Sequence, residues 1–286
     1  MNMIAWPDGR IVPALGQGTW KMGEDGRRRQ EEVRALRTGL DLGLSVIDTA
    51  EMYAEGGAEE VVAEAIAGQR DKVFLVSKVY PHNASRNRLP MALARSLKRL
   101  KTDVLDCYLL HWRGSVPLAD TAEAMERMQQ AGHIRSWGVS NLDLAEMQTL
   151  PGIAGRMVHG SADHAPGCAT NQVLLHLGER GVEFDLAPWM ARHAMPLMAY
   201  SPLGQGAILD HPTLASLATR HNCSPAAIAL AWVLSRPGTM AIPKTGTPHR
   251  VADNARALEI TLDSTDLSAL DTSFPPPRRK RPLAML

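Results

Sequence analysis

The feature that most constrains the fold is a regular alternation of short apolar runs with amphipathic stretches along most of the 286 residues. Eight such runs have the length and composition of buried strands. They comprise residues 14–18, 45–49, 73–78, 104–111, 134–140, 169–173, 197–201 and 240–242. Because neighbouring parallel strands need long crossover connections, this alternation predicts a parallel sheet covered by helices.

The stretches between the runs carry a helical pattern. In segment 30–44, Val33, Leu36 and Leu40 recur at steps of three and four residues, which places them on one helix face. Segment 88–100 repeats the pattern with four leucines. These segments are therefore expected to be helices that pack an apolar face against the sheet.

The count of eight strand-helix units favours a closed (β/α)₈ barrel, with an open doubly wound sheet as the alternative. Ahead of the first unit, residues 3–6 and 11–12 flank the turn sequence Pro-Asp-Gly-Arg and predict a small β-hairpin at the barrel bottom. Residues 150–167 predict an irregular loop over the barrel mouth. Since no linker or repeat interrupts the pattern, the whole chain, 1–286, is expected to be a single domain.

Composition excludes several classes of function. The chain is 45% hydrophobic and 21% charged, and its 31 basic residues balance 30 acidic ones. This balance gives no support for binding to nucleic acid or to a membrane surface. No apolar run is long enough to span a membrane, and no signal-peptide pattern stands at the start. With three widely separated cysteines, a cytoplasmic protein without a metal site is expected.

Ionisable residues stand at the ends of three successive predicted strands. Asp48 lies at the end of the second, Lys78 ends the third and His111 ends the fourth, while Tyr53 lies in the loop after the second. Each residue alone has an ordinary structural explanation, such as a helix cap or a solvated strand end. Because the carboxyl ends of barrel strands meet at one mouth, the four side chains are expected to converge there.

The four side chains suit the reduction of a carbonyl group by hydride. This reaction needs a proton donor for the carbonyl oxygen, and neither a metal nor a covalent nucleophile. The tyrosine hydroxyl has an ordinary pKa near 10, which a neighbouring lysine ammonium would lower. An aspartate would keep that lysine charged, and a histidine would hydrogen-bond the carbonyl. We therefore expect Tyr53 to be the acid, supported by Asp48, Lys78 and His111.

At this point the sequence resembles the aldo-keto reductases. The segments that carry the resemblance occur in the order of that family and are Asp48-Thr49-Ala50-x-x-Tyr53, Ser77-Lys78, Leu109-Leu110-His111-Trp112, Trp137-Gly138-Val139-Ser140-Asn141, Asn171-Gln172, Ala199-Tyr200-Ser201-Pro202-Leu203-Gly204 and Ile242-Pro243-Lys244. The resemblance implies a closed barrel, the use of NADPH and a catalytic tetrad of Asp48, Tyr53, Lys78 and His111.

The resemblance also implies where NADPH would bind. Ser140, Asn141 and Gln172 are implied at the nicotinamide carboxamide, with Tyr200 stacked on the ring, and Thr19 and Trp20 on the cofactor and substrate side of the pocket. Gly18 and Asp48 are implied as further cofactor-binding residues. Those implied at the pyrophosphate and the adenosine 2′-phosphate are Ser201, Leu203, Gln205, Lys244, Thr245, Arg250 and Asn254. For the substrate pocket we expect Trp20, Tyr53, His82, His111 and Trp112.

At the level of subgroups, segment 47–54 and the short tail resemble bacterial enzymes tied to methylglyoxal reduction. A small carbonyl substrate and a monomeric state are expected. Arg113 stands where many relatives have proline, so one wall of the substrate loop departs from the pattern. Two alternatives remain, a cofactor-sensing regulatory subunit on the same barrel and an isomerase or aldolase. The intact tetrad argues against the first, and the pairing of Lys78 with a carboxylate argues against the second.

Overall fold

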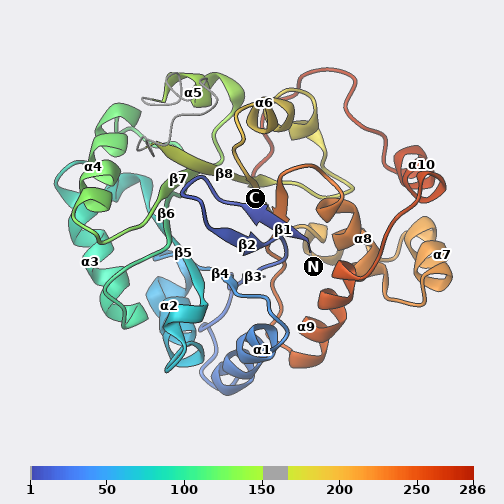
Figure 1. Ribbon diagram of the computed structural model, residues 1–286, viewed down its shortest axis with the longest axis horizontal. Helices are drawn as coiled ribbons and strands as arrows, with labels where there is room; N and C mark the ends of the chain where they lie inside the picture. Colours follow the sequence, from blue (N-terminus) through green and yellow to red (C-terminus); the bar gives the residue numbers. More distant parts are fainter. Residues whose placement is uncertain (1, 151–166) are drawn as a thin grey trace.

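The computed structural model describes residues 2–150 and 167–286. Its centre is a sheet of eight strands in which each strand pairs in parallel with the next along the chain (Figure 1). The strands are β3 (Gln17–Gly18), β4 (Val46–Asp48), β5 (Phe74–Val79), β6 (Cys107–Leu110), β7 (Trp137–Ser140), β8 (Cys168–Leu174), β9 (Leu197–Tyr200) and β10 (Thr239–Ala241). The predicted eight-stranded parallel sheet is confirmed.

The first and last strands of this sheet meet, so the barrel is closed. Leu15 forms a parallel bridge with Ala241, and Gly18 forms one with Lys244. The amide of Gly18 donates a hydrogen bond to the carbonyl of Pro243 at 2.9 Å. A Cβ atom at Gly18 would lie 2.8 Å from the carbonyl oxygen of Ile242, so this close approach requires glycine. The open doubly wound alternative is thereby excluded.

Helices surround the barrel (Figure 1). They are α1 (Arg29–Asp41), α2 (Gly57–Ala65), α3 (Arg88–Leu100), α4 (Leu118–Gln130), α5 (Leu144–Thr149), α6 (Leu186–Arg192), α7 (Pro212–Arg220), α8 (Pro225–Leu234), α9 (Pro248–Ala255) and α10 (Ser264–Ser273). The predicted helix 88–100 is confirmed. The one predicted at 30–44 ends earlier, at Asp41, because Gly43 takes a left-handed conformation (φ 84°) that turns the chain into β4.

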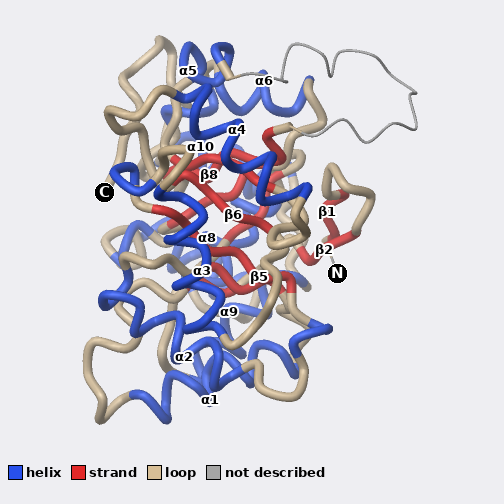
Figure 2. Tube along the Cα trace, turned by 90° about the vertical axis from the view of Figure 1, so that its left-hand side faces the viewer, coloured by secondary structure: helices blue, strands red, loops and turns tan. Residues whose placement is uncertain are grey.

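A β-hairpin precedes the barrel, as the sequence predicts. Strands β1 (Met3–Ala5) and β2 (Ile11–Pro13) pair antiparallel and lie to one side of the barrel strands in Figure 2. Trp6, which follows β1, is buried, and its indole Nε1 donates to the Ser136 hydroxyl at 3.0 Å. The same ring packs edge-on against Phe74, 4.9 Å between centroids. Because Ser136 and Phe74 lie at the amino ends of β7 and β5, the hairpin covers the barrel bottom.

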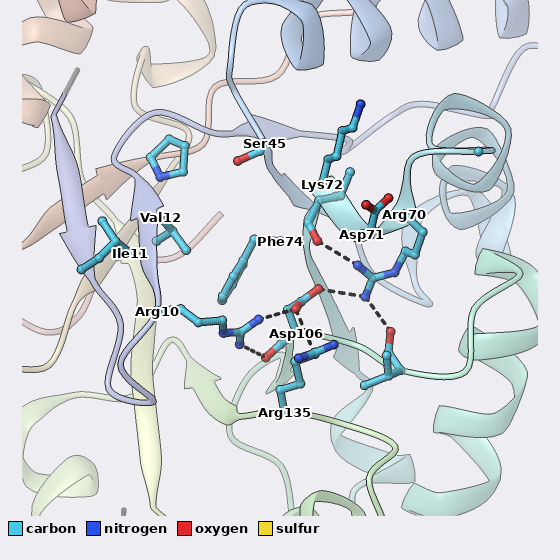
Figure 3. A pocket seen from close by; sticks show the side chains of 14 residues that line it. Arg10, Ile11, Val12, Ser45, Arg70, Asp71, Lys72, Phe74, Asp106 and Arg135 are labelled. Carbon is cyan, nitrogen blue, oxygen red and sulfur yellow. Dashed lines mark hydrogen bonds and ion pairs between the residues drawn. The ribbon is translucent and has the colours of Figure 1, made fainter. Parts of the chain in front are cut away.

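Beside the hairpin, the carboxylate of Asp106 contacts three arginines (Figure 3). Asp106, directly before β6, is buried and contacts the guanidinium groups of Arg10, of Arg70 at 2.8 Å and of Arg135 at 3.5 Å. It also accepts a hydrogen bond from the amide of Leu75 at 2.9 Å. Since these partners come from the hairpin and from the starts of several strands, Asp106 ties the barrel bottom together.

The loop predicted over the barrel mouth, 150–167, falls almost wholly outside the described residues. Across the part of the chain that is described, no helix is both long and apolar enough to cross a membrane.

Candidate active site

At the carboxyl ends of the strands the barrel opens into a pocket of about 180 Å³. Most of the residues that the sequence assigns to a site line it together. They are Gly18, Thr19, Trp20, Asp48, Tyr53, His111, Trp112, Ser140, Asn141, Gln172, Tyr200, Ser201, Gln205 and Lys244. The end of the barrel that the motifs predict therefore holds a cavity that is lined by the predicted residues.

Lys78 connects the polar side chains of this site, and the group of Asp48, Lys78 and Tyr53 is called the hub below. Lys78 lies on β5 and is completely buried. Its Nζ donates to Asp48 Oδ2 at 2.7 Å, to the carbonyl of Thr49 at 2.9 Å and to the Tyr53 hydroxyl at 3.2 Å. All three donors of the ammonium thus have partners, which fixes its position.

Tyr53 reaches this hub because the chain turns tightly after β4. It begins a 3₁₀ turn, Tyr53–Gly56, in which Ala54 and Glu55 both have left-handed backbone angles (φ 51° and 53°). Such conformations are unfavourable for non-glycine residues. The turn leaves the Tyr53 ring partly exposed to the pocket, while its hydroxyl lies beside the buried Lys78 ammonium.

The charges of the hub can be assigned. Burial disfavours the ammonium form of Lys78, but the opposite charge of Asp48 more than offsets it, so the pKa of Lys78 is raised. For Tyr53, burial raises the pKa above its ordinary value, and Lys78 opposes only part of this rise. The expectation that the lysine brings the pKa of Tyr53 below 10 is therefore wrong for the protein alone, because burial outweighs the neighbouring charge.

His111 follows β6 and faces Tyr53 edge-on, with ring centroids 5.7 Å apart. Burial, reinforced by the charge of Lys78, lowers the pKa of His111 to about 2. The imidazole is consequently neutral at physiological pH. Its Nδ1 is buried and has no hydrogen-bond partner in the described part of the chain, which leaves Nε2 to meet a molecule in the pocket.

Amide and hydroxyl groups from β7, β8 and β9 form another wall of the pocket. The Gln172 side-chain nitrogen donates to Asp48 Oδ1 at 2.8 Å, and the Ser140 hydroxyl donates to the main-chain carbonyl of Gln172 at 2.8 Å. The Tyr200 hydroxyl donates to Asn141 Oδ1 at 3.0 Å. Asn141 itself has a left-handed backbone (φ 58°), which turns its side chain from the end of β7 toward this wall. The wall thus combines amide donors and acceptors with one aromatic ring.

A groove of about 550 Å³ continues from the pocket and shares Trp20, Ser201, Gln205 and Lys244 with it. The remaining predicted cofactor residues, Leu203, Thr245, Arg250 and Asn254, line this groove. Burial lowers the pKa of Lys244, with the neighbouring Glu32 opposing the shift. Pocket and groove form one long cleft, with amides at its inner end and, at its outer end, three cations and the carboxylate of Asp253, which accepts a hydrogen bond from Ser224. This distribution suits an extended ligand with a neutral head and an anionic tail.

Two predicted site residues do not line the cleft, Lys78, which is buried behind it, and His82. His82 is exposed and stacks on Tyr80, 4.8 Å between ring centroids. The Tyr80 ring packs edge-on against Trp112, which lines the pocket. The rings of Tyr80 and Trp112 therefore separate His82 from the pocket. Arg113 points to the surface, 3.9 Å from Glu146.

Sequence reasoning missed several lining residues. Met52, Ile242 and Leu286 line the pocket, and the amide of Leu286 donates to the Tyr200 hydroxyl at 3.3 Å. Lys21 lines the groove, with its ammonium 4.5 Å from the centre of the Trp20 ring. The apolar residues carry no chemical signal in the sequence. Lys21 does carry one, as a cation next to a predicted cofactor residue.

Comparison with known proteins agrees with this geometry. Residues 14–273 match the Aldo/keto reductase family, and the chain belongs to that family. It is therefore an oxidoreductase that acts on aldehyde or ketone groups, and the family resemblance seen in the sequence is confirmed.

The chain is 51% identical to the methylglyoxal reductase YeaE of Escherichia coli strain K12, over 100% of this chain and 99% of that protein. It is 31% identical to the glyoxal reductase of Bacillus subtilis strain 168, over 92% of this chain and 90% of that protein. Among solved structures, an aldo/keto reductase from Klebsiella pneumoniae in complex with NADP and acetate superposes with a TM-score of 0.92. It shares 49% sequence identity, with 100% of this chain and 99% of that one covered.

Proposed function

We propose that this protein reduces small aldehydes, dicarbonyls of the methylglyoxal type or ketones to alcohols with hydride from NADPH, and that Tyr53 donates the proton. The observation that carries the proposal is the Lys78 ammonium, held by Asp48 at 2.7 Å and placed 3.2 Å from the Tyr53 hydroxyl. The relatives named for methylglyoxal and glyoxal reduction, and the neighbour crystallised with NADP, support the substrate class and the cofactor.

Each residue of the tetrad has a separate role in the proposed reduction. NADPH, when bound, supplies the hydride for the carbonyl carbon. Tyr53 gives its proton to the carbonyl oxygen, and Lys78 stabilises the negative charge that remains on the phenolate. His111 is neutral, so it serves as a hydrogen-bond donor to the same oxygen through Nε2 rather than as a second charged acid. Asp48 keeps Lys78 charged and in place.

The cleft also fits the shape and charge of NADPH. Ser140, Asn141 and Gln172 offer hydrogen-bonding groups for a carboxamide, and the Tyr200 ring lies beside them for stacking. At the other end, Lys244 and Arg250 stand near the amino end of helix α9, where main-chain amides and cations both favour a phosphate. The inner end thus suits nicotinamide, and the outer end suits the adenosine 2′-phosphate.

Replacing Arg250 with alanine is expected to weaken NADPH binding selectively. A charge-assisted hydrogen bond contributes roughly 1.5–3 kcal/mol, so the Kd for NADPH should rise about ten- to a hundredfold. NADH has only a hydroxyl at this position, and its Kd should barely change. Fluorescence titration with both cofactors measures this difference. His249→Ala, at the exposed neighbouring residue of α9, is the matched control. Equal weakening of both cofactors by Arg250→Ala would show that Arg250 supports the loop and does not bind the phosphate.

The alternative function is a sensor that binds NADPH without turnover. Such a protein needs the cofactor-binding wall and groove, but it has no use for a buried lysine held against a tyrosine hydroxyl. Loss of NADPH absorbance with methylglyoxal, compared with fluorescence quenching by NADPH alone, separates the two. We also propose that the chain works as a single-domain monomer in the cytoplasm. The family resemblance supports the monomer, and the three widely separated cysteines support the cytoplasm. Size-exclusion chromatography and cell fractionation test the two statements.

A further inference from the structure

A continuous chain of hydrogen bonds joins Gln172, Asp48, Lys78 and Tyr53. It leads from the amide-lined wall of the pocket, called the cofactor wall below, to the Tyr53 hydroxyl. Gln172 donates to Asp48 Oδ1 at 2.8 Å, while Asp48 Oδ2 accepts from Lys78 at 2.7 Å. Lys78 in turn donates to the Tyr53 hydroxyl at 3.2 Å. Gln172 and Asp48 are each 2% exposed, and Lys78 is 0% exposed. Asp48 therefore holds two different donors with its two oxygens, and water does not compete for either.

The chemistry of Asp48 fixes which way the Gln172 amide faces. An ionised carboxylate only accepts hydrogen bonds, so Gln172 must present its NH₂ group to Asp48. Its carbonyl oxygen, Oε1, is then the polar atom that remains for the pocket that Gln172 lines. The adjacent residue of β8, Asn171, donates instead to the carbonyl of Leu142 at 2.8 Å, which is a structural contact. Only one of the two neighbouring amides connects the pocket to the catalytic hub.

We propose that Gln172 is a positioning residue that couples the bound nicotinamide carboxamide to the proton donor. When an N–H of the nicotinamide carboxamide donates to Gln172 Oε1, it polarises the side-chain amide of Gln172. The hydrogen bond that Gln172 donates to Asp48 then becomes stronger. Asp48 is thereby held in the orientation that keeps Lys78 against Tyr53. This inference rests on the proposed function, because it takes Tyr53 as the proton donor and NADPH as the occupant of the wall.

The charges around the hub agree with this arrangement. Burial raises the pKa of Asp48, and the hydrogen bond from Gln172 joins Lys78 in opposing that rise. The other titratable side chains facing Tyr53 are neutral at physiological pH, since His111 is unprotonated and burial raises the pKa of Tyr200. Gln172 is thus the neutral donor that helps Asp48 remain a carboxylate beside Lys78.

The test compares the same substitution at two glutamines. Gln172→Met keeps the length of the side chain and removes its hydrogen-bonding groups, and Gln130→Met makes the same change at an exposed residue of α4 that lines neither the pocket nor the groove. Single-turnover reduction of methylglyoxal is measured at saturating NADPH, with the Kd for NADPH measured separately. We expect Gln172→Met to lower the single-turnover rate about tenfold or more, in addition to weakening NADPH. Gln130→Met should leave both that rate and the Kd for NADPH within about twofold of the wild type.

A second comparison asks whether Gln172 acts through Tyr53. In the Tyr53→Phe background no proton donor is left to position, so Gln172→Met should lower the residual rate no further, a non-additive result. An equal loss in both backgrounds would overturn the proposal, since Gln172 would then act on hydride geometry alone. A change confined to the Kd for NADPH would also overturn it.

Two further variants separate a folding defect, a failure of the proposed function and a failure of the role of Gln172. If Gln172→Met fails to fold, Gln172→Asn replaces it, because its amide is one methylene too short to reach Asp48 and the same non-additivity is expected. A Tyr53→Phe variant that reduces methylglyoxal at the wild-type rate would refute the proposed function itself. Loss of activity in Tyr53→Phe with additive effects of Gln172→Met would refute only the role of Gln172.

Discussion

Replacing Tyr53 with phenylalanine is expected to lower kcat for carbonyl reduction by about 10²- to 10⁴-fold, the usual contribution of a general acid. The substitution keeps the aromatic ring and removes only the hydroxyl that Lys78 contacts at 3.2 Å. Binding of NADPH should be nearly unchanged, because the described contacts of the cofactor wall do not involve that hydroxyl. Steady-state kinetics with methylglyoxal and fluorescence titration with NADPH measure the two quantities. Wild-type kcat in Tyr53→Phe would exclude Tyr53 as the acid.

The pH dependence of the wild-type enzyme follows from the same geometry. A general acid must be protonated to act, and the pKa of Tyr53 lies above its ordinary value of 10.0. Reduction should therefore be constant through neutral pH and decline only above about pH 10, as Tyr53 loses its proton. His111 adds no acidic limb in the neutral range, since its pKa is about 2. A decline in kcat/KM centred between pH 6 and 8 would contradict this assignment.

The largest expected loss of stability comes from Asp106→Asn at the barrel bottom. The substitution keeps the size of the side chain and removes the charge shared by Arg10, Arg70 and Arg135. Breaking a fully buried ion pair costs about 3–5 kcal/mol. The side chains of Arg10 and Arg70 are 29% and 25% exposed and regain some hydration, so we expect a smaller decrease in the free energy of unfolding, roughly 2–4 kcal/mol.

Urea unfolding of wild type and variant measures this difference. The matched control is Asp120→Asn, which breaks a surface ion pair with Arg86 at 3.1 Å and should change stability by less than about 0.5 kcal/mol. Because Asp106 lies at the opposite end of the barrel from the pocket, kcat of folded Asp106→Asn should match the wild type. Equal free energies of unfolding of the two variants would show that the contacts of Asp106 with the three arginines do not stabilise the fold.

The sequence located the strands and the mouth of the barrel well, for a physical reason. Buried parallel strands need continuous apolar runs, and polar residues such as Asp48 and Lys78 stand out at the ends of those runs. Barrel closure depends on hydrogen bonds between residues 14–18 and residues 241–243, which no local pattern records. The count of eight units favoured closure but left an open sheet as the alternative, and the family resemblance implied the closed barrel. The bridges to Ala241 and Lys244 confirm it.

Features that depend on tertiary packing were not predictable in this way. The Asp106 cluster joins arginines from distant parts of the chain, and each of them alone has the pattern of an ordinary surface charge. His82 was placed in the pocket from its proximity to Lys78 in sequence, but stacking on Tyr80 holds it outside. The direction of the pKa shift of Tyr53 depends on how burial compares with one nearby charge, and burial is a property of the folded barrel.

The pairing of β3 with β10 has a consequence for synthesis of the protein on the ribosome. Strand β3 ends at Gly18, but its partner on one side, β10, is not made until residue 241. Until then, every nascent intermediate carries an open β-edge, which is a site for pairing with other chains. The last barrel strand to leave the ribosome is therefore the one that removes this aggregation hazard, and a ribosome stalled before residue 239 would expose it.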